Sequence, residues 1–212
     1  MKADKSISNA HQDFEMNRSR KGPAGVFQYF YHSAGEELPV RDVVNRQKTE
    51  PHYEYENLTE NWCGRCTNGR IRSANRRGVR FLFLVTRYFK KEHRLHRKLL
   101  VVGYLFRAED RVWRKLSRSL RSGVAGYESS KPQDCGFFAG DETKSHFVSA
   151  NAAFELRVKN GRWKYFADEV ETKKIVAHLK KSKNILPKLR EKVRELKAQI
   201  SQENREKRCK TI

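Results

Sequence analysis

Residues 76–106 read RRGVRFLFLVTRYFKKEHRLHRKLLVVGYLF, and this stretch decides the fold of the chain. Val79–Thr86 and Leu99–Phe106 are short, mostly apolar and rich in β-branched and aromatic residues, which predicts two β-strands. Apolar side chains occupy both faces of each strand, so we expect them at the centre of a barrel or of a covered sheet. The connection between them, Arg87–Lys98, is dominated by cationic side chains.

The chain as a whole is strongly basic. Its 212 residues are enough for one domain with a hydrophobic core, and 46 Lys and Arg against 25 Asp and Glu give a net charge of +21. This imbalance favours polyanionic partners, and a basic surface that only keeps the protein in solution is the alternative. Arg65 to Arg121 holds 18 cationic and three acidic side chains, hence +15 of the total. Most of these cations are arginines, which suit phosphate and base stacking better than lysines do.

We therefore predict a surface that binds nucleic acid, with RNA and DNA both open as ligands. The residues expected to contact it lie in this basic stretch and in a later basic segment. They are Arg65, Arg70, Arg72, Arg76, Arg77, Arg94, Arg97, Arg111, Arg114, Lys115, Arg118, Arg157, Lys159, Arg162 and Lys164.

Part of that surface is predicted to be a helix. Glu109–Arg121 has the pattern of a short amphipathic helix, with Asp110 placed to cap its start. Val112 belongs to the apolar face, Trp113 lies beside that face, and the polar face is entirely basic. Such a helix suits contact with phosphates, whereas an ordinary surface helix would carry acidic partners at helical spacing.

The cysteines at residues 61–73, NWCGRCTNGRIRS, admit three interpretations. The WCGxC pattern resembles a thioredoxin active site, but Thr67, Asn68 and Gly69 favour a turn after it, not the helix that lowers a thiolate pKa. The second interpretation is a zinc site, and the third, which we favour, is a tight turn with small half-buried thiols.

The zinc interpretation combines Cys63 and Cys66 with His93 and His96. The two histidines lie in a strongly cationic connection, where repulsion opposes metal binding, and the gap between the pairs is wider than in compact fingers. The sequence therefore predicts no metal and no cofactor.

Three parts are predicted along the chain: a flexible N-terminal arm at residues 1–25, a β-barrel domain at residues 26–170 and a basic C-terminal helical segment at residues 171–212. Val26–His32 is aromatic-rich and predicts the first strand. Val40, Val43 and Val44 recur at helical spacing and favour a short helix over Leu38–Gln47.

Leu156–Phe166 carries a strong hairpin signal, because Asn160-Gly161 suits a type I′ turn between alternating residues. In that register Leu156 faces Tyr165, and Arg157 faces Lys164. We expect the apolar face, Leu156, Val158, Trp163 and Tyr165, to cover the core, and the basic face, Arg157, Lys159, Arg162 and Lys164, to follow a phosphate backbone.

The C-terminal segment predicts two helices, Thr172–Lys181 and a second that starts near Asn184 and Pro187. Apolar residues of the second helix recur at spacings of three and four. We expect this face to pack on the domain and the protein to be a monomer, with a weak dimer as the alternative. The residues are Leu186, Leu189, Val193, Leu196 and Ile200.

The strand–basic connection–strand core, with FLVTR before the connection and VVGY after it, resembles PUA-like β-barrel domains, including the EVE, ASCH and nucleotide-modification-associated groups. An aromatic-Gly-Asp segment around residues 137–141 and FVSANAAFEL at 147–156 are similar to the closing part of such domains. The likeness covers Trp62–Phe166, and the basic connection departs from it. The resemblance implies an α+β fold, a small mixed or antiparallel barrel with flanking helices, that binds RNA or holds a modified base in a pocket.

Under this resemblance Trp62, Tyr104 and Trp113 are candidates for stacking on a base, with packing in the core as the alternative. A nucleic-acid-cleaving or -modifying enzyme is the second function class, although acids are scarce and only Asp141-Glu142 followed by Lys144 hints at a nuclease site. A structural basic protein, ribosome-associated or packaging, is the third. We expect no catalytic residues, no membrane association and a cytoplasmic location with reduced thiols.

Overall fold

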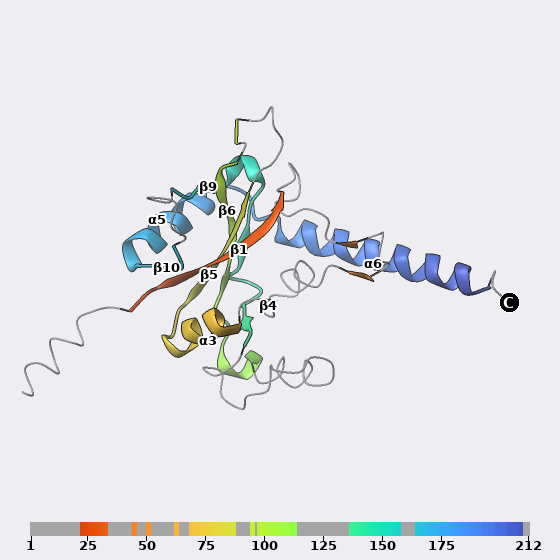
Figure 1. Ribbon diagram of the computed structural model, residues 1–212, viewed down its shortest axis with the longest axis horizontal. Coiled ribbons are helices and arrows are strands. Elements are labelled where there is room, and N and C mark those ends of the chain that lie inside the picture. The colour runs from red at the N-terminus through yellow and green to blue at the C-terminus, as the bar shows by residue number, and fades with distance from the viewer. Residues whose placement is uncertain are drawn as a thin grey trace, which may run out of the picture.

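The structure, a computed structural model, describes residues 22–33, 44–45, 50–51, 62–63, 68–87, 94–95, 97–113, 136–157 and 164–209. Within these ranges the protein is built on one large β-sheet with helices against it, and a long C-terminal helix extends away from the sheet (Figure 1). The α+β class predicted from the sequence is confirmed.

The large sheet is mostly antiparallel and open. β1 and β5 pair in parallel, and the other strand pairs of this sheet are antiparallel. The order across the sheet is β10 (Phe166–Ala167), β1 (Gly25–Ser33), β5 (Phe81–Arg87), β6 (Leu99–Phe106) and β8 (His146–Phe147), and β9 (Phe154–Glu155) also pairs with β6.

The predicted closed barrel is therefore wrong for the described part of the chain. A barrel needs the two edges of a sheet to pair with each other. Here β10 lies at one edge and β8 and β9 at the other, and each of these strands has two residues, too few for a closing ladder.

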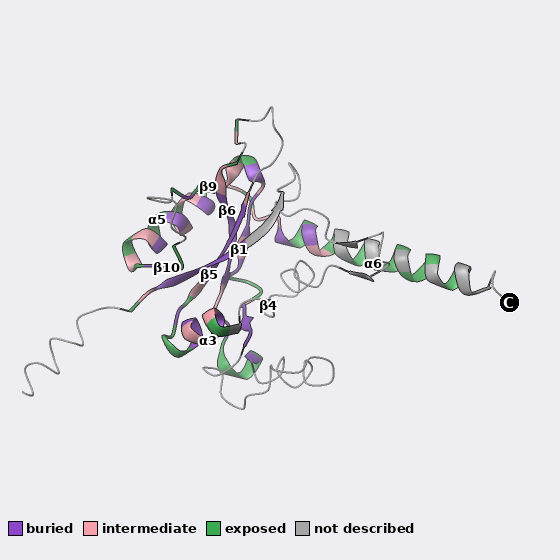
Figure 2. Cartoon of the chain, in the orientation of Figure 1, coloured by how far each residue is buried: buried purple, intermediate pink, exposed green. Residues whose placement is uncertain are grey.

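The two strands predicted from residues 76–106 are β5 and β6, and they are interior strands with both faces buried, as expected. Leu82 and Leu84 of β5 point into one apolar cluster, and Phe83 and Val85 point into a second cluster on the opposite face. Figure 2 shows burial along most of the length of these strands. Apolar runs with no alternation are what a sheet covered on both faces requires.

Three helices cover the sheet. α5 (Glu169–Leu179) covers the face of Phe83 through Ile175 and Leu179. On the face of Leu82, Ile71 and Ala74 of α3 (Asn68–Arg76) and Leu186 and Leu189 of α6 (Leu186–Cys209) join the same apolar cluster. The predicted pair of C-terminal helices and the packing of the second against the domain are thus confirmed for these residues. The side chains of Val193, Leu196 and Ile200 lie outside the description.

Two local predictions are wrong. α3 starts at Asn68, where a turn was expected, because Ile71, Ala74 and Asn75 share a buried face whose packing outweighs the turn preference of Asn68-Gly69. Val44–Asn45 is strand β2, paired with β3 (Glu50–Pro51), and not part of a helix. The other short elements are β4 (Trp62–Cys63), β7 (Phe138–Ala139), which pairs with β4, and the 3₁₀ turn η3 (Ala150–Ala152).

The hairpin predicted for Leu156–Phe166 is wrong at its outermost pair, Leu156 with Tyr165. The amide of Leu156 donates to the carbonyl of Leu99 in β6, whereas the carbonyl of Tyr165 accepts from the amide of Phe27 in β1. β5 separates β6 from β1, so Leu156 does not face Tyr165. The pairing partners offered by the sheet outweigh the local turn signal. Asn160 and Gly161 themselves lie outside the described residues.

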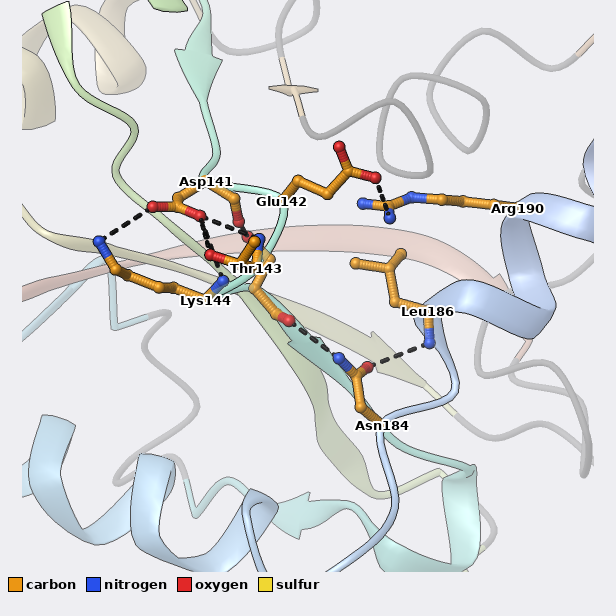
Figure 3. Close-up of polar contacts among 8 residues, drawn as sticks. Asp141, Glu142, Thr143, Lys144, Asn184, Leu186 and Arg190 are labelled. Carbon is orange, nitrogen blue, oxygen red and sulfur yellow. Dashed lines mark hydrogen bonds and ion pairs between the residues drawn. The ribbon is translucent and has the colours of Figure 1, made fainter.

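Asn184 fixes the start of α6. Its Oδ1 accepts from the amide of Leu186, and its Nδ2 donates to the carbonyl of Ser145 (Figure 3). The same Oδ1 also accepts from the amide of Phe147. The amide of Ile185 also donates to the carbonyl of Phe147, which extends the pairing at the β8 edge. Among the described residues, no helix combines the length and apolar character needed to cross a bilayer.

Candidate nucleic-acid interface

The fold divides the basic stretch of the sequence between two ends of the sheet. α3 precedes the first residue of β5 and the 107–113 segment follows β6, so both lie at one end (Figure 1). The 94–98 segment leads from β5 back to β6 at the other end, about 20 Å away along a seven-residue strand. Among the described residues, the cations of the basic stretch therefore do not form one continuous surface.

The basic surface at the first end consists of α3 and the turn that follows it. The side chains that form it are Arg70, Arg72, Arg76, Arg77 and Arg80, and we call them the α3 surface. No acidic residue occurs between Asn68 and Arg87. The helix buries Ile71, Ala74 and Asn75, whereas Arg76 and Arg77 are exposed and Arg70 and Arg72 are partly exposed.

Aromatic residues border the α3 surface on its β10 side. The guanidinium of Arg70 lies 3.9 Å from the centre of the Tyr165 ring, and that of Arg77 lies 5.1 Å from the centre of the Phe166 ring. Both are cation–π contacts. Tyr165 retains 42% of its surface exposed, although the hairpin prediction placed its side chain on the core.

Two carboxylates of α5 mark the limit of this surface. Arg80 donates to both carboxylate oxygens of Glu169, at 3.0 and 2.9 Å, and Lys164 forms an ion pair with Glu171. These pairs neutralise Arg80 and Lys164, so an anionic ligand is attracted more strongly to the other arginines of the α3 surface than to the α5 side.

A buried polar contact fixes α3 to the core. Asn75 is 2% exposed and its Nδ2 donates to the carbonyl of Phe137 at 3.0 Å. Arg107 donates from Nη1 to Asn75 Oδ1 at 3.2 Å, and its guanidinium lies 4.8 Å from the centre of the Trp113 ring. The helix therefore presents its arginines on a rigid support.

The three predicted stacking rings are core residues in this structure. Trp62 is 6% exposed, and Tyr104 and Trp113 are each 1% exposed. Tyr104 packs edge-on against Phe81, and Trp113 stacks on Phe137 at 5.0 Å between ring centres. A ring buried in this way offers no face to a base, so the alternative of core packing is the correct one.

The predicted helix 109–121 is described only at its first turn, residues 110–113. The amides of Val112 and Trp113 donate to the carbonyl of Glu109. Val112 is 43% exposed and Trp113 is buried, so the residue that packs on the core is Trp113 and not Val112. Arg111 is exposed and pairs with Glu109 at 3.0 Å.

Of the residues in the cysteine and zinc interpretations, the structure describes Cys63. Cys63 lies in β4 and is 5% exposed, so it is buried in a strand and not half-buried in a turn. Cys66, His93 and His96 lie outside the description. Among the described residues, no group of three His, Cys, Asp or Glu side chains is placed to hold a metal ion.

The Asp141-Glu142 and Lys144 pattern forms a turn (Figure 3). Oδ1 of Asp141 accepts from the amide and hydroxyl of Thr143, its Oδ2 pairs with Lys144 at 3.0 Å, and Glu142 pairs with Arg190 of α6 at 2.6 Å. Burial alone would raise the pKa of Asp141, but the hydrogen bonds from Thr143 and Lys144 hold it below its ordinary value. These groups account for the turn and for its link to α6.

At the far end of the sheet, Arg94 and Arg97 are exposed and Lys98 pairs with Glu155 at 2.7 Å. Arg97 has a φ of 61°, a left-handed conformation that is unfavourable for a residue with a side chain. Arg157 is exposed beside the β6 edge, so the structure separates it from Lys164 at the β1 edge.

The structure thus brings together Arg70, Arg72, Arg76 and Arg77 of the predicted site and separates Arg94, Arg97 and Arg157 from them. The sequence analysis did not include Arg80, which belongs to the α3 surface, or place Tyr165 at its border. The absence of acids between residues 68 and 87 was the signal for Arg80. The remaining predicted residues, Arg65, Arg114, Lys115, Arg118, Lys159 and Arg162, lie outside the described ranges.

No family model, curated protein or solved structure matches this chain.

Proposed function

We propose that the protein binds nucleic acid through the α3 surface. One observation carries the proposal: Arg70, Arg72, Arg76, Arg77 and Arg80 lie on one helix and its following turn, with no acid between residues 68 and 87. Guanidinium groups that follow one another so closely along the chain favour a ligand with closely spaced negative charges, and a phosphate backbone has that spacing.

The packing of α3 supports the same function. A helix that binds phosphates must hold its cations at fixed positions, since ordering loose side chains costs affinity. Ile71, Ala74 and Asn75 anchor the helix from beneath, and the contacts of Arg70 and Arg77 with aromatic rings limit the motion of their long side chains.

The resemblance to PUA-like domains agrees with the proposal, because it implies RNA binding. We propose this kinship on the strand–basic connection–strand core alone. The open sheet and the burial of Trp62, Tyr104 and Trp113 lead us to place the ligand on the surface.

The experiment is a titration of fluorescein-labelled RNA and DNA oligonucleotides, single-stranded and duplex, followed by anisotropy at several salt concentrations. For about six neutralised phosphates we expect a log–log salt slope near −5 on duplex and about −4 on single strands. The double variant Arg76→Gln/Arg77→Gln should bind more weakly, with a slope smaller by one to two units.

The matched control is Arg194→Gln/Arg205→Gln, which removes two exposed arginines from α6 and lowers the net charge equally. We expect this control to bind almost as the parent does. If both double variants lose the same affinity, total charge and not the α3 surface determines binding, and a salt slope near zero for the parent would exclude phosphate binding altogether.

A further inference from the structure

Tyr165 is an aromatic side chain exposed beside the cations of the α3 surface. Among the described residues, the large apolar or aromatic side chains that stand out as exposed are Val112, Tyr165 and Val170, and only Tyr165 carries a ring. Tyr165 immediately precedes β10, the strand at the edge of the sheet. It therefore combines a flat apolar surface with access to solvent.

The backbone beneath this ring is held at two points. The carbonyl of Tyr165 accepts from the amide of Phe27 at 2.9 Å, and the preceding carbonyl, of Lys164, accepts from the hydroxyl of Tyr29 at 2.6 Å. Tyr29 is 8% exposed, and burial raises its pKa to about 12, so it stays a proton donor at neutral pH. The Tyr165 ring is thus carried by a main chain fixed to β1.

Arg70 holds the ring from α3. Its guanidinium lies 3.9 Å from the ring centre, within the range of a cation–π contact. A guanidinium over an aromatic ring both fixes the ring plane and places a positive charge next to whatever the ring contacts. The geometry therefore pairs a stacking surface with a phosphate-binding group.

The charged side chains around Tyr165 differ between its α3 side and its α5 side. Arg70 and Arg77 lie on its α3 side, whereas Glu169 and Glu171 lie on its α5 side, where they pair with Arg80 and Lys164. A phosphate backbone is therefore drawn more strongly to the α3 side than to the α5 side, where the charges are paired. A base that extends from such a backbone toward β10 meets the Tyr165 ring.

We propose that Tyr165 stacks on an unpaired base, so that the ligand of the α3 surface is single-stranded nucleic acid. This inference rests on the proposed nucleic-acid binding and specifies its ligand class. In a duplex the bases are stacked on one another and cannot cover an external ring, whereas an unpaired base can. RNA and DNA single strands share this chemistry, and the 2′-hydroxyl distinguishes them.

The test compares Tyr165→Ala, Tyr165→Leu and Tyr165→Phe with the parent on single-stranded RNA, single-stranded DNA and a duplex of the same sequence. Tyr165→Phe keeps the ring and should bind as the parent does. Tyr165→Leu keeps apolar bulk for packing but has no ring, so it serves if Tyr165→Ala is not folded. We expect the ringless variants to bind single strands about fivefold to a hundredfold more weakly, the range for loss of one base–aromatic stack.

A second readout reports stacking itself. 2-Aminopurine placed in the single strand loses fluorescence when it stacks, and we expect quenching by the parent and by Tyr165→Phe but not by Tyr165→Leu. Duplex affinity should be the same for the parent and Tyr165→Phe. It should fall far less than single-strand affinity in the ringless variants, which also lose the ring contact of Arg70. A preference of the parent for the RNA or the DNA strand identifies the sugar.

The outcomes separate this inference from the function on which it rests. If Tyr165→Leu binds and quenches single strands as the parent does, while Arg76→Gln/Arg77→Gln loses affinity, the α3 surface binds phosphates and the stacking inference is wrong. Equal losses on duplex and single strand would also overturn it, since Tyr165 would then act only by steadying Arg70. If the parent binds no nucleic acid, both proposals fall.

Discussion

The α3 region and α6 are both basic, yet they differ in how their charges are distributed. Residues 68–87 contain six arginines and no acid, whereas α6 contains eight cations and four acids. On α6 the four acids lie within a turn or two of cations and offset half of their charge. Between residues 68 and 87 no acid of the same segment offsets the arginines, so the two basic regions differ in how densely their positive charge is placed along the chain.

The two regions are also alike in one respect, since an asparagine fixes each of them to the core. Asn75 connects α3 to Phe137 and Arg107, and Asn184 connects the start of α6 to Ser145 and Phe147. Matched substitutions in the two regions can therefore separate effects on stability from effects on binding.

The largest expected effect comes from the apolar anchors of the two helices. Ile71 of α3 and Leu186 of α6 are each 1% exposed and belong to the same cluster. Ile71→Ala and Leu186→Ala should each lower the free energy of unfolding by about 2–5 kcal/mol, measured by urea denaturation.

Their effects on binding should differ. At a temperature where both variants remain folded, Ile71→Ala should weaken nucleic-acid binding because it loosens the α3 surface, and Leu186→Ala should not. If Leu186→Ala weakens nucleic-acid binding equally, α6 also belongs to the interface and the two helices do not differ in binding.

The polar anchor of α6 should give a smaller effect. Asn184→Ala leaves the amide of Phe147 and the carbonyl of Ser145 without their partner, which should cost about 1–3 kcal/mol of stability. Hydrogen exchange should show faster exchange of the Phe147 and Leu186 amides. The control Asn184→Asp retains an oxygen that accepts from both amides, so their protection from exchange should fall less. If protection falls equally in both variants, the hydrogen bond donated by Nδ2, and not the acceptor Oδ1, holds this region.

Acid should loosen the α6 end of the molecule before the α3 end. The ring of His146 stacks on Tyr104, and its Nε2 contacts the carbonyl of Ser182 at 3.1 Å in the α5–α6 connection. Burial lowers the pKa of His146 below its ordinary value of 6.5, and the charge of Lys180 acts the same way, although the carbonyls of Ser182 and Leu179 oppose them.

A lowered pKa means that the folded state holds the proton less tightly than the unfolded state does. Stability should therefore fall as the pH drops below 6.5, until the folded-state pKa is passed. Thermal melts of the parent and of His146→Gln between pH 7 and 4 measure this, and the variant should have the flatter profile. A parent-like profile in His146→Gln would show that other groups dominate.

The smallest effect tests the acidic limit of the α3 surface. Glu171→Gln removes a negative charge and releases Lys164 from its ion pair, so affinity for single strands should rise about twofold to threefold at low salt. Glu203→Gln, an exposed residue of α6, is the matched control and should change little. If affinity rises equally in both variants, the change in net charge alone explains the effect.

Several features could be predicted from the sequence because they depend on neighbours along the chain. The runs of residues 79–86 and 99–106 are apolar on both faces, and they form the two covered central strands β5 and β6. Asn184 and Pro187 indicate the start of a helix. Leu186 and Leu189 are spaced three residues apart in that helix, and both lie in the core.

Other features depended on partners distant in the chain. Asn160-Gly161 predicted a hairpin, but the adjoining residues pair with β6 and β1, because those strands offer ladders that a local signal does not reveal. Trp62, Tyr104 and Trp113 have the composition of a base-binding site, and only their burial shows that they belong to the core.

Sequence alone predicts the α+β class, the two central strands, the two C-terminal helices and the basic charge. All of these follow from periodicity and composition, which are local or summed properties. Only the tertiary structure decided that the sheet is open and that Arg70 and Tyr165 meet. It also decided that the cations of the 94–98 segment lie at the far end from α3. The physical reason is that strand order and helix packing are selected by long-range burial of apolar surface, and residues close in sequence are thereby placed at opposite ends of a strand.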